Sequence, residues 1–308
     1  MFAGGRQRLH HQADRHRKTA VAAAHLDAGA TRCAALRLEI SEPEIAQLLE
    51  IIYQRYHYDF RQYAAASLKR RLQQALTHFR CATLQQLQDL LTSDESVFPR
   101  LLEYLTVQVS DLFRDPEFFL TLRQQVMPLL ATYPSLKLWI AGCSTGEEAY
   151  SFAIALAEEG LLDRTRIYAT DINDGSLRKA QKGVYPLDRM RQFTMNHRAA
   201  GGHGSLSDYY HASHDSAVMS PTLKQHITFA DHSLATDSIF SEVQLVSCRN
   251  VLIYFDRLLQ DRALGLFHDA LCRRGFLCLG TKESVRFSAY AQRFQELSPE
   301  QKIYRRVD

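Results

Sequence analysis

From Leu136 onward, short apolar segments alternate with longer amphipathic ones, and this alternation restricts the fold more than any other feature of the sequence. The apolar segments have the length of strands, and the amphipathic ones have the length of helices. Such alternation is typical of a parallel sheet in an α/β fold. The predicted strands are 137–141, 166–170, 227–230, 243–247, 275–279 and 302–306, and the predicted helices are 147–159, 175–182 and 257–273.

Residues 184–226 interrupt the alternation. The segment is rich in Ser and His and contains a loop with Gly201, Gly202 and Gly204. It is too long for a simple crossover between a strand and a helix. We therefore predict a small inserted subdomain made of a few antiparallel strands.

Residues 37–107 contain no strand-like segment and are predicted to form a helical domain. Leu68, Leu72 and Leu76 recur at helical spacing. The segment also carries basic side chains away from this apolar face, namely Arg61, Lys69, Arg70 and Arg71. An ordinary solvated face explains them as well as a docking face for an acidic partner does.

Residues 1–36 are rich in Arg, His and Ala and are predicted to be a disordered or atypical extension. A transit peptide has a similar composition, and a misassigned start codon would give the same result. A solvated tail explains His10, His11 and His16 better than a metal site does, so no metal is predicted. Basic and acidic residues are nearly balanced in the rest of the chain, which argues against nucleic-acid binding.

The location of the protein is suggested by what its sequence lacks. There is no run of about 18 apolar residues and no signal-peptide pattern, so neither membrane insertion nor secretion is expected. The six cysteines are scattered and form no CxxC pair. Free thiols in a reducing compartment explain them better than disulfides or zinc, so we expect a cytoplasmic protein.

A glycine turn follows the first predicted strand, at residues 142–146. A turn of this kind lets the backbone approach a nucleoside closely, with free amides at the start of the next helix. It is not the GxGxxG pattern, and Glu147 with Glu148 would repel a pyrophosphate, which argues against NAD and ATP. A cofactor with a sulfonium and an ammonium group tolerates both carboxylates, so the turn favours S-adenosylmethionine. The helix macrodipole accounts for part of their presence.

An aspartate, Asp171, follows the second predicted strand. At that end of a sheet a carboxylate can accept hydrogen bonds from a ribose diol. Alternatively, Asp171 caps the helix that begins near Asp174. Together with the glycine turn, it supports a nucleoside site on an α/β sheet.

Three longer motifs occur in order along the chain. Residues 112–119 read LFRDPEFF, residues 143–151 read CSTGEEAYS, and residues 247–255 read SCRNVLIYF. They resemble the FFRDPxxF, CSTGEEPYS and FCRNVLIYF signatures of the CheR family, the chemotaxis-receptor glutamate methyltransferases. Residues 58–71 resemble the start of that family, so the resemblance covers roughly residues 41–307.

The resemblance implies a Rossmann-like class I methyltransferase sheet with helices on both faces in residues 108–308. It also implies a small N-terminal all-helical domain and an inserted antiparallel β-subdomain. The implied reaction transfers methyl from S-adenosylmethionine to glutamate side chains of a chemoreceptor, a methyl-accepting chemotaxis protein. The products are a glutamate methyl ester and S-adenosylhomocysteine.

The family's cofactor contacts can be placed on this sequence position by position. Asn is common in the family at the positions of Gln108 and Ser233, and Thr is common at that of Ser110. Each change keeps a hydrogen-bonding group, so it bears on affinity more than on the reaction. Which of Glu147 and Glu148 faces the cofactor stays open. With Gly142 of the glycine turn, the expected cofactor-binding residues are Gln108, Ser110, Arg114, Gly142, Glu147, Glu148, Asp171, Ser233, Leu234, Arg249 and Asn250.

Arg114 and Tyr254 are the expected catalytic residues. Arg114 can orient a carboxylate through its planar fork, and Tyr254 can donate one neutral hydrogen bond. Without the resemblance we would expect Arg114 only to pair with Asp111 or Asp115, and Tyr254 only to pack.

The expected partner is the cytoplasmic helical domain of a chemoreceptor, docked on the basic residues of the helical domain. A receptor C-terminal peptide is a further expected partner, bound as an added strand at 184–226. We expect a monomer. The first alternative is a methyltransferase for another protein, such as a signalling protein outside chemotaxis, or for a small carboxylic acid. The second is a non-catalytic adaptor that binds S-adenosylmethionine or a receptor, and the third is a nicotinamide oxidoreductase. The retained motif residues argue against the adaptor, and the missing GxGxxG pattern argues against the oxidoreductase.

Overall fold

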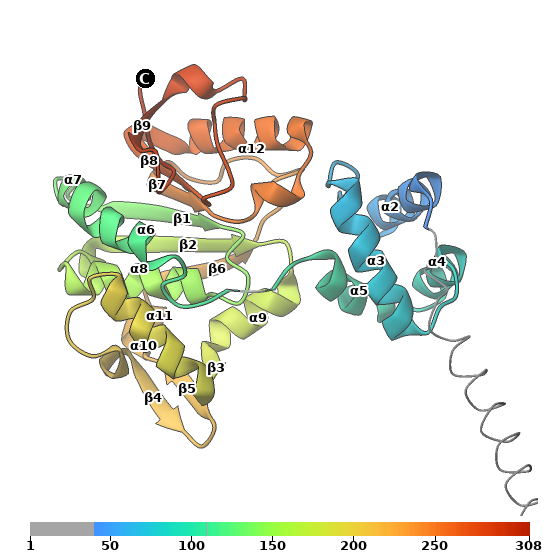
Figure 1. Ribbon diagram of the computed structural model, residues 1–308, viewed down its shortest axis with the longest axis horizontal. Coiled ribbons are helices and arrows are strands. Elements are labelled where there is room, and N and C mark those ends of the chain that lie inside the picture. Colours follow the sequence, from blue (N-terminus) through green and yellow to red (C-terminus); the bar gives the residue numbers. More distant parts are fainter. Residues whose placement is uncertain (1–39, 109) are drawn as a thin grey trace, which may run out of the picture. The chain divides into compact units, whose positions relative to one another are not determined.

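The computed structural model describes residues 40–108 and 110–308 (Figure 1). The expectations for residues 1–36, including those for His10, His11 and His16, lie outside the described residues. Residues 42–308 form one compact unit. Among the described helices, none combines the length and the apolar character that a membrane span needs.

Four helices make up the first part of this unit. Their bounds are α2 (Glu42–Tyr56), α3 (Ala65–Phe79), α4 (Leu84–Ser93) and α5 (Val97–Leu105). Leu68, Leu72 and Leu76 are buried on α3, as their spacing predicted. The hydroxyl of Thr83 accepts a hydrogen bond from the Gln86 amide and so caps α4. The predicted helical segment is confirmed.

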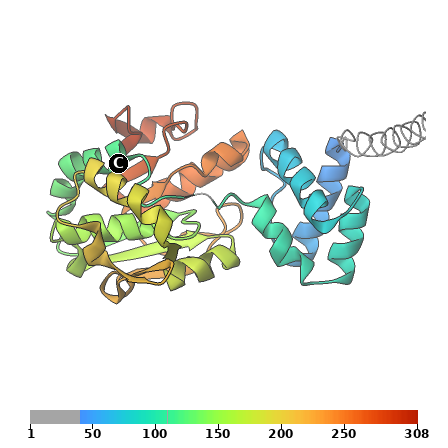
Figure 2. The same cartoon turned by 60° about the horizontal axis from the view of Figure 1, so that its bottom comes forward.

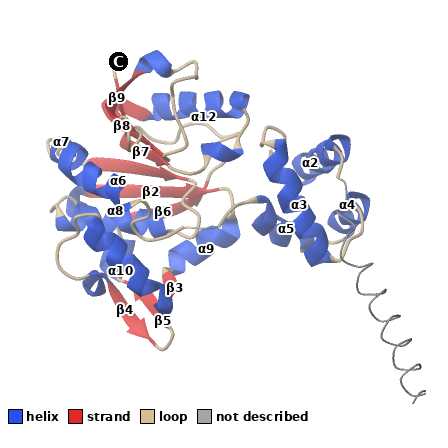
Figure 3. Cartoon of the chain, viewed as in Figure 1, coloured by secondary structure: helices blue, strands red, loops and turns tan. Residues whose placement is uncertain are grey.

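A seven-stranded sheet forms the second part (Figure 3). Its strands lie in the order β6 (Ile227–Asp231), β2 (Thr165–Asp171), β1 (Leu136–Ala141), β7 (Val243–Cys248), β8 (Leu271–Leu279), β10 (Ile303–Arg306) and β9 (Phe294–Ser298). The first five are parallel, and β10 is antiparallel to both of its neighbours. The six predicted strands are present.

Side chains of β1 are buried on both faces of the sheet. Leu138 and Ile140 belong to the core cluster that includes α8 (Glu147–Glu158), whereas Trp139 belongs to the one that includes α12 (Arg257–Ala270). Figures 1 and 2 show helices on both faces. Burial on both faces explains the continuous apolar run of this strand. The Rossmann-like methyltransferase fold is confirmed.

Shorter elements lie before and between the strands, several of them within the inserted residues 184–226. They are the helices α6 (Pro116–Thr121), α7 (Met127–Leu130), α9 (Asp174–Lys182) and α11 (Pro221–Lys224), the π-helical turn η1 (Leu122–Val126), and the 3₁₀ turns η2 (Leu162–Arg164), η3 (Leu187–Arg189), η4 (Leu206–Tyr209), η5 (Leu252–Tyr254) and η6 (Ala291–Arg293).

The inserted segment forms a separate antiparallel sheet, as predicted. Its strands lie in the order β3 (Val184–Pro186), β5 (Ser216–Met219) and β4 (Tyr210–Ser213), so β4 is an edge strand. The insert also contains α10 (Met190–Ala199), which we did not predict. Met190, Phe193 and His197 are its buried residues, and their spacing is helical.

The boundary between α12 and β8 differs from the prediction. The helix ends at Ala270 instead of residue 273, and the strand begins at Leu271 instead of residue 275. Leu271 pairs with Val243 of the neighbouring strand. Pairing within the sheet therefore overrides the helical pattern that continues through this region. The edge strand β9, which has polar residues, was also not predicted.

Candidate active site

A cavity lies where the strands β1, β2, β6 and β7 end. The space inside it, counted together with its open mouth, is about 870 Å³. Ligands of open α/β sheets bind at this carboxyl edge. The lining residues are Tyr63, Arg71, Thr106, Val107, Gln108, Ser110, Arg114, Gly142, Ser144, Asp171, Ile172, Ser176, His232, Leu234, Arg249, Asn250, Val251, Tyr254 and Phe255.

Most of the residues that the sequence predicts to bind the cofactor or to act in catalysis line this cavity. Those that line it are Gln108, Ser110, Arg114, Gly142, Asp171, Leu234, Arg249, Asn250 and Tyr254. Ser233 is next to the lining residue Leu234. Its amide donates to the Asp237 carboxylate at 2.9 Å, and its hydroxyl is buried.

The glycine turn requires a residue without a side chain at its start. Gly142 has a φ of +74°, a region that L-residues rarely adopt. A Cβ at this position would lie 2.4 Å from a methyl group of Val251, another residue of the cavity wall. The amides of Gly142 and Cys143 both donate to the carbonyl of Thr170 on the adjacent strand. The turn is therefore fixed against both neighbouring strand ends.

The Asp171 carboxylate is oriented by backbone amides. It accepts hydrogen bonds from the amides of Ser144, at 2.8 Å, and Asn173, at 2.9 Å. Burial raises the pKa of Asp171, and these two bonds partly oppose that effect. The cap of α9 is Asn173, whose side chain accepts from the Ser176 amide. The structure thus assigns the helix cap to Asn173 and leaves Asp171 on the cavity wall.

The two glutamates at the start of α8 have different partners. Glu147 is buried; its carboxylate accepts from the Thr145 hydroxyl at 2.7 Å and from Arg189 at 3.3 Å. Burial raises the pKa of Glu147. The Glu148 carboxylate accepts from the Ser247 hydroxyl at 2.6 Å and from Arg249 at 3.3 Å. Neither Glu147 nor Glu148 lines the cavity as far as the structure describes it. Glu148 does contact Arg249, which lines the cavity.

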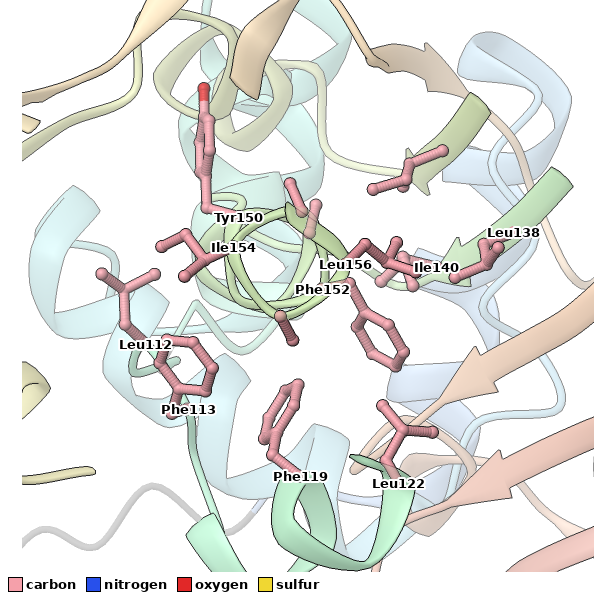
Figure 4. Packing of buried hydrophobic residues seen from close by; sticks show 14 of the residues in the cluster. Leu112, Phe113, Phe119, Leu122, Leu138, Ile140, Tyr150, Phe152, Ile154 and Leu156 are labelled. Atoms are coloured by element: carbon pink, nitrogen blue, oxygen red, sulfur yellow. The ribbon is translucent and has the colours of Figure 1, made fainter. Parts of the chain in front are cut away.

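The loop that carries Arg114 is anchored by its apolar neighbours. Figure 4 shows Leu112, Phe113 and Phe119 packed around α8, the helix of Phe152. The rings of Phe113 and Phe119 lie 5.1 Å apart, and the Phe113 amide donates to the Ser151 hydroxyl at 2.8 Å. The φ of Phe113 is +52°, so the backbone turns sharply before Arg114. Buried aromatic packing thus fixes the position of Arg114 on the cavity wall.

Arg249 ties this loop to the sheet. Its buried guanidinium pairs with Asp115 at 2.8 Å and with Glu148 at 3.3 Å, and it lies 3.9 Å from the Phe118 ring centroid. It also donates to the carbonyl of Arg114 at 3.2 Å. Asp111, on the same loop, pairs with Arg189 at 2.7 Å. Arg249 therefore has a structural role besides the predicted cofactor contact.

The four basic residues expected to dock a partner are not equivalent. Lys69 and Arg70 are exposed. Arg61 pairs with Asp59 at 2.9 Å and with Glu50 at 3.1 Å. Arg71 differs from the expectation of a surface residue: it is buried, and it lines the cavity. Arg71 lies on the buried face of α3. It therefore faces the cavity and not a partner docked on the exposed face.

Several buried polar atoms around the cavity have no hydrogen-bond partner within the described part of the chain. They are Gln108 Nε2, the hydroxyl oxygens of Ser144, Ser176 and Ser233, His232 Nδ1, Arg249 Nε, and Nε and Nη2 of Arg71. Buried polar groups are normally satisfied. Their concentration around one cavity indicates a polar ligand with several donors and acceptors.

Comparison with known proteins identifies the family. Residues 43–106 match the family described as "CheR methyltransferase, all-alpha domain", and residues 108–303 match "CheR methyltransferase, SAM binding domain". The chain belongs to the CheR methyltransferase family. A putative methyltransferase Cher3 of Pseudomonas putida is 58% identical over 263 residues, which cover 85% of this chain and 96% of that protein. The chemotaxis protein methyltransferase of Escherichia coli K12 is 26% identical over 275 residues, covering 84% and 89%.

The cofactor of this CheR methyltransferase is S-adenosylmethionine. The residues present fit it: Asp171 is placed for a ribose diol, and the unpartnered serine hydroxyls and the Gln108 amide supply further hydrogen bonds.

Some residues of the site were missed by sequence reasoning. Ser144 and His232 follow strands β1 and β6, so their position at the carboxyl edge was a usable signal. Arg189 comes from the insert and Glu283 from the loop after β8. No local pattern distinguishes these two, because tertiary packing alone brings them close to the site.

Proposed function

We propose that this chain transfers the methyl group of S-adenosylmethionine to glutamate side chains of a chemoreceptor, giving a glutamate methyl ester and S-adenosylhomocysteine. The observation that carries this proposal is that Arg71, Arg114 and Tyr254 line the same cavity as the expected cofactor residues. Two guanidinium groups and a phenol suit a small anionic group better than an amine or an apolar substrate.

The proposed reaction requires no proton transfer by the protein. A glutamate carboxylate has a pKa of about 4.3, so it is ionised at neutral pH and needs no general base. Bound S-adenosylmethionine supplies an electrophilic methyl group on a positively charged sulfur. The chain therefore has to bind, align and desolvate the two partners, which are the main sources of rate in such a site.

Arg71, Arg114 and Tyr254 are proposed to align the carboxylate. A cation on the attacking oxygen would lower its nucleophilicity, so the arginines should hold one oxygen and leave the other free. The Tyr254 hydroxyl donates one neutral hydrogen bond, which orients the carboxylate without neutralising it. Tyr63 and Phe255 line the same cavity and restrict the access of water.

The helical part of the chain is proposed to bind the receptor. Lys69 and Arg70 are exposed on α3, one turn or less from the cavity residue Arg71. A carboxylate-bearing helix that docks on them would be guided toward the cavity by charge. The edge strand β4 of the insert is proposed to take a receptor C-terminal peptide as an added strand.

The test is transfer of radiolabelled methyl from S-adenosylmethionine to chemoreceptor-containing membranes by the purified chain. Label that stays on the receptor and is released by mild base as methanol is the expected result, because a carboxyl ester is base-labile. Base-stable label, or label on another protein, would refute the proposal. Tyr254→Phe provides an internal comparison, since it removes one hydroxyl and should slow transfer.

Binding of the product S-adenosylhomocysteine should be measured in the same preparations. A chain that binds it but labels no membrane protein would refute receptor methylation and leave the assignment of the cofactor cavity in place. A chain that binds neither would contradict the assignment of the cavity as well.

A further inference from the structure

Glu283 is a buried carboxylate in the loop that follows β8. One of its oxygens accepts hydrogen bonds from the backbone amides of Gly280, at 2.6 Å, and Asn250, at 3.0 Å. The other accepts from the amide of Ile253, at 3.2 Å. The side chain therefore joins its own loop to the turn at residues 250–254, which comes from a different strand.

That turn has a backbone conformation that needs support. Asn250 has a φ of +61°, in the left-handed region that residues other than glycine rarely adopt. The Asn250 and Ile253 amides both donate to Glu283, and without it the partly buried Asn250 amide would lose its carboxylate acceptor. The approach is also close: a Cβ on Gly280 would lie 2.8 Å from the Asn250 nitrogen and from the Glu283 carboxylate.

The same turn carries side chains of the active site. Asn250, Val251 and Tyr254 all line the cavity. The far end of the turn has a further support, because the Tyr254 carbonyl accepts from the amide of Ala64 at 2.8 Å. Glu283 is thus the support of the end that carries Asn250.

We propose that Glu283 is a positioning residue for cofactor binding, which holds the 250–254 turn in the conformation where Asn250 faces the cavity. This rests on the proposed role of Asn250 in binding the cofactor. The role requires a carboxylate. A glutamine in its place has the same shape but one acceptor oxygen, and its amide hydrogens would face backbone N–H groups.

The test uses calorimetric titration with S-adenosylhomocysteine, which needs no protein substrate. Glu283→Gln should weaken binding by about tenfold, which corresponds to a turn that holds the binding-competent conformation about a tenth of the time. Lys282→Ala, an exposed neighbour, is the matched control and should bind like the wild type. Asn250→Ala should also weaken binding. The double variant should be no weaker than Asn250→Ala alone, because Glu283 acts through Asn250.

If the fold-losses of affinity of the two single variants multiply in the double variant, the proposal is overturned. Such independent effects would mean that Glu283→Gln damages the structure generally and does not act through Asn250. Wild-type affinity of either single variant would overturn it equally. Failure of receptor methylation would leave these affinities unaffected, so the two proposals fail separately.

Gly280→Ala is a second route to the same contact if Glu283→Gln does not fold. The added methyl group presses on both the Asn250 nitrogen and the Glu283 carboxylate. Weaker binding of S-adenosylhomocysteine by a folded Gly280→Ala chain, not additive with Asn250→Ala, supports the proposal. Wild-type affinity of that chain would refute it.

Discussion

The guanidinium carbon of Arg71 lies 4.4 Å from the centroid of the Tyr254 ring, so a cation of the helical segment stacks on an aromatic residue of the sheet segment. Its Nη1 donates to the carbonyl of Leu105, whereas Nε and Nη2 are buried and have no partner among the described residues. Burial lowers the pKa of Arg71. A carboxylate bound in the cavity that both side chains line would offset this cost.

Arg71→Lys should slow methyl transfer by about tenfold to a hundredfold, because lysine keeps the charge but loses the planar, stacked fork. Binding of S-adenosylhomocysteine should change by less than about threefold, since the proposed role concerns the substrate. Single-turnover labelling and calorimetry measure the two effects. Arg198→Lys, at an exposed arginine outside the proposed docking residues, is the control. Full activity of Arg71→Lys would show that its charge alone matters.

The exposed pair Lys69 and Arg70 should act on encounter with the receptor. In the double variant Lys69→Glu and Arg70→Glu, the KM for receptor should rise while the affinity for S-adenosylhomocysteine stays the same. The neutral double variant to glutamine should fall between it and the wild type. Added salt should weaken the wild type more than the reversed variant, because exposed charges are screened. An equal loss of cofactor affinity would contradict the docking role.

The carboxyl edge of the sheet was the most predictable part of the site. Gly142, Asp171 and Asn250 each follow a strand that the alternation of apolar segments predicts. Parallel strands bring their carboxyl ends to one edge, so residues distant in sequence meet there. Local pattern and topology together therefore place them without any knowledge of side-chain packing.

The remaining parts of the site depend on packing that sequence does not encode locally. Arg71 has the same helical context as Arg70, and only the docking of α3 decides which of them is buried. The sequence likewise does not distinguish Glu147 from Glu148. In the structure Arg189, from the insert, pairs with Glu147, and Arg249 pairs with Glu148. Each of these choices is made by a partner from another element.

Arg249 should be essential for stability as well as for binding. Arg249→Met removes a buried cation and leaves the partly exposed carboxylates of Asp115 and Glu148 without it, which should lower the free energy of unfolding by about 1.5–3 kcal/mol. Urea unfolding without ligand measures this loss. Arg286→Met is the control, because Arg286 pairs with Glu296 in an exposed position and such pairs contribute about 0–1 kcal/mol. Similar losses of unfolding free energy for the two variants would mean that Arg249 contributes no more to stability than an exposed ion pair does.

Asp171 should make cofactor binding depend on pH. Burial raises the pKa of Asp171 above that of a free aspartate, and the like charge of Asp231 raises it further. The ionised carboxylate is the form that accepts hydrogen bonds from a ribose diol. Affinity for S-adenosylhomocysteine should therefore be full above the raised pKa and fall as the pH drops through it, by at most about tenfold per pH unit.

Calorimetry between about pH 8 and about pH 5 tests this dependence, with Asp171→Asn as the comparison. Asparagine cannot ionise, so this variant should bind more weakly at high pH and lose the acid-dependent fall. Glu147 and Glu283 also have pKa values raised by burial. A fall that persists unchanged in Asp171→Asn would therefore remove Asp171 from the binding step and assign the pH dependence to another group.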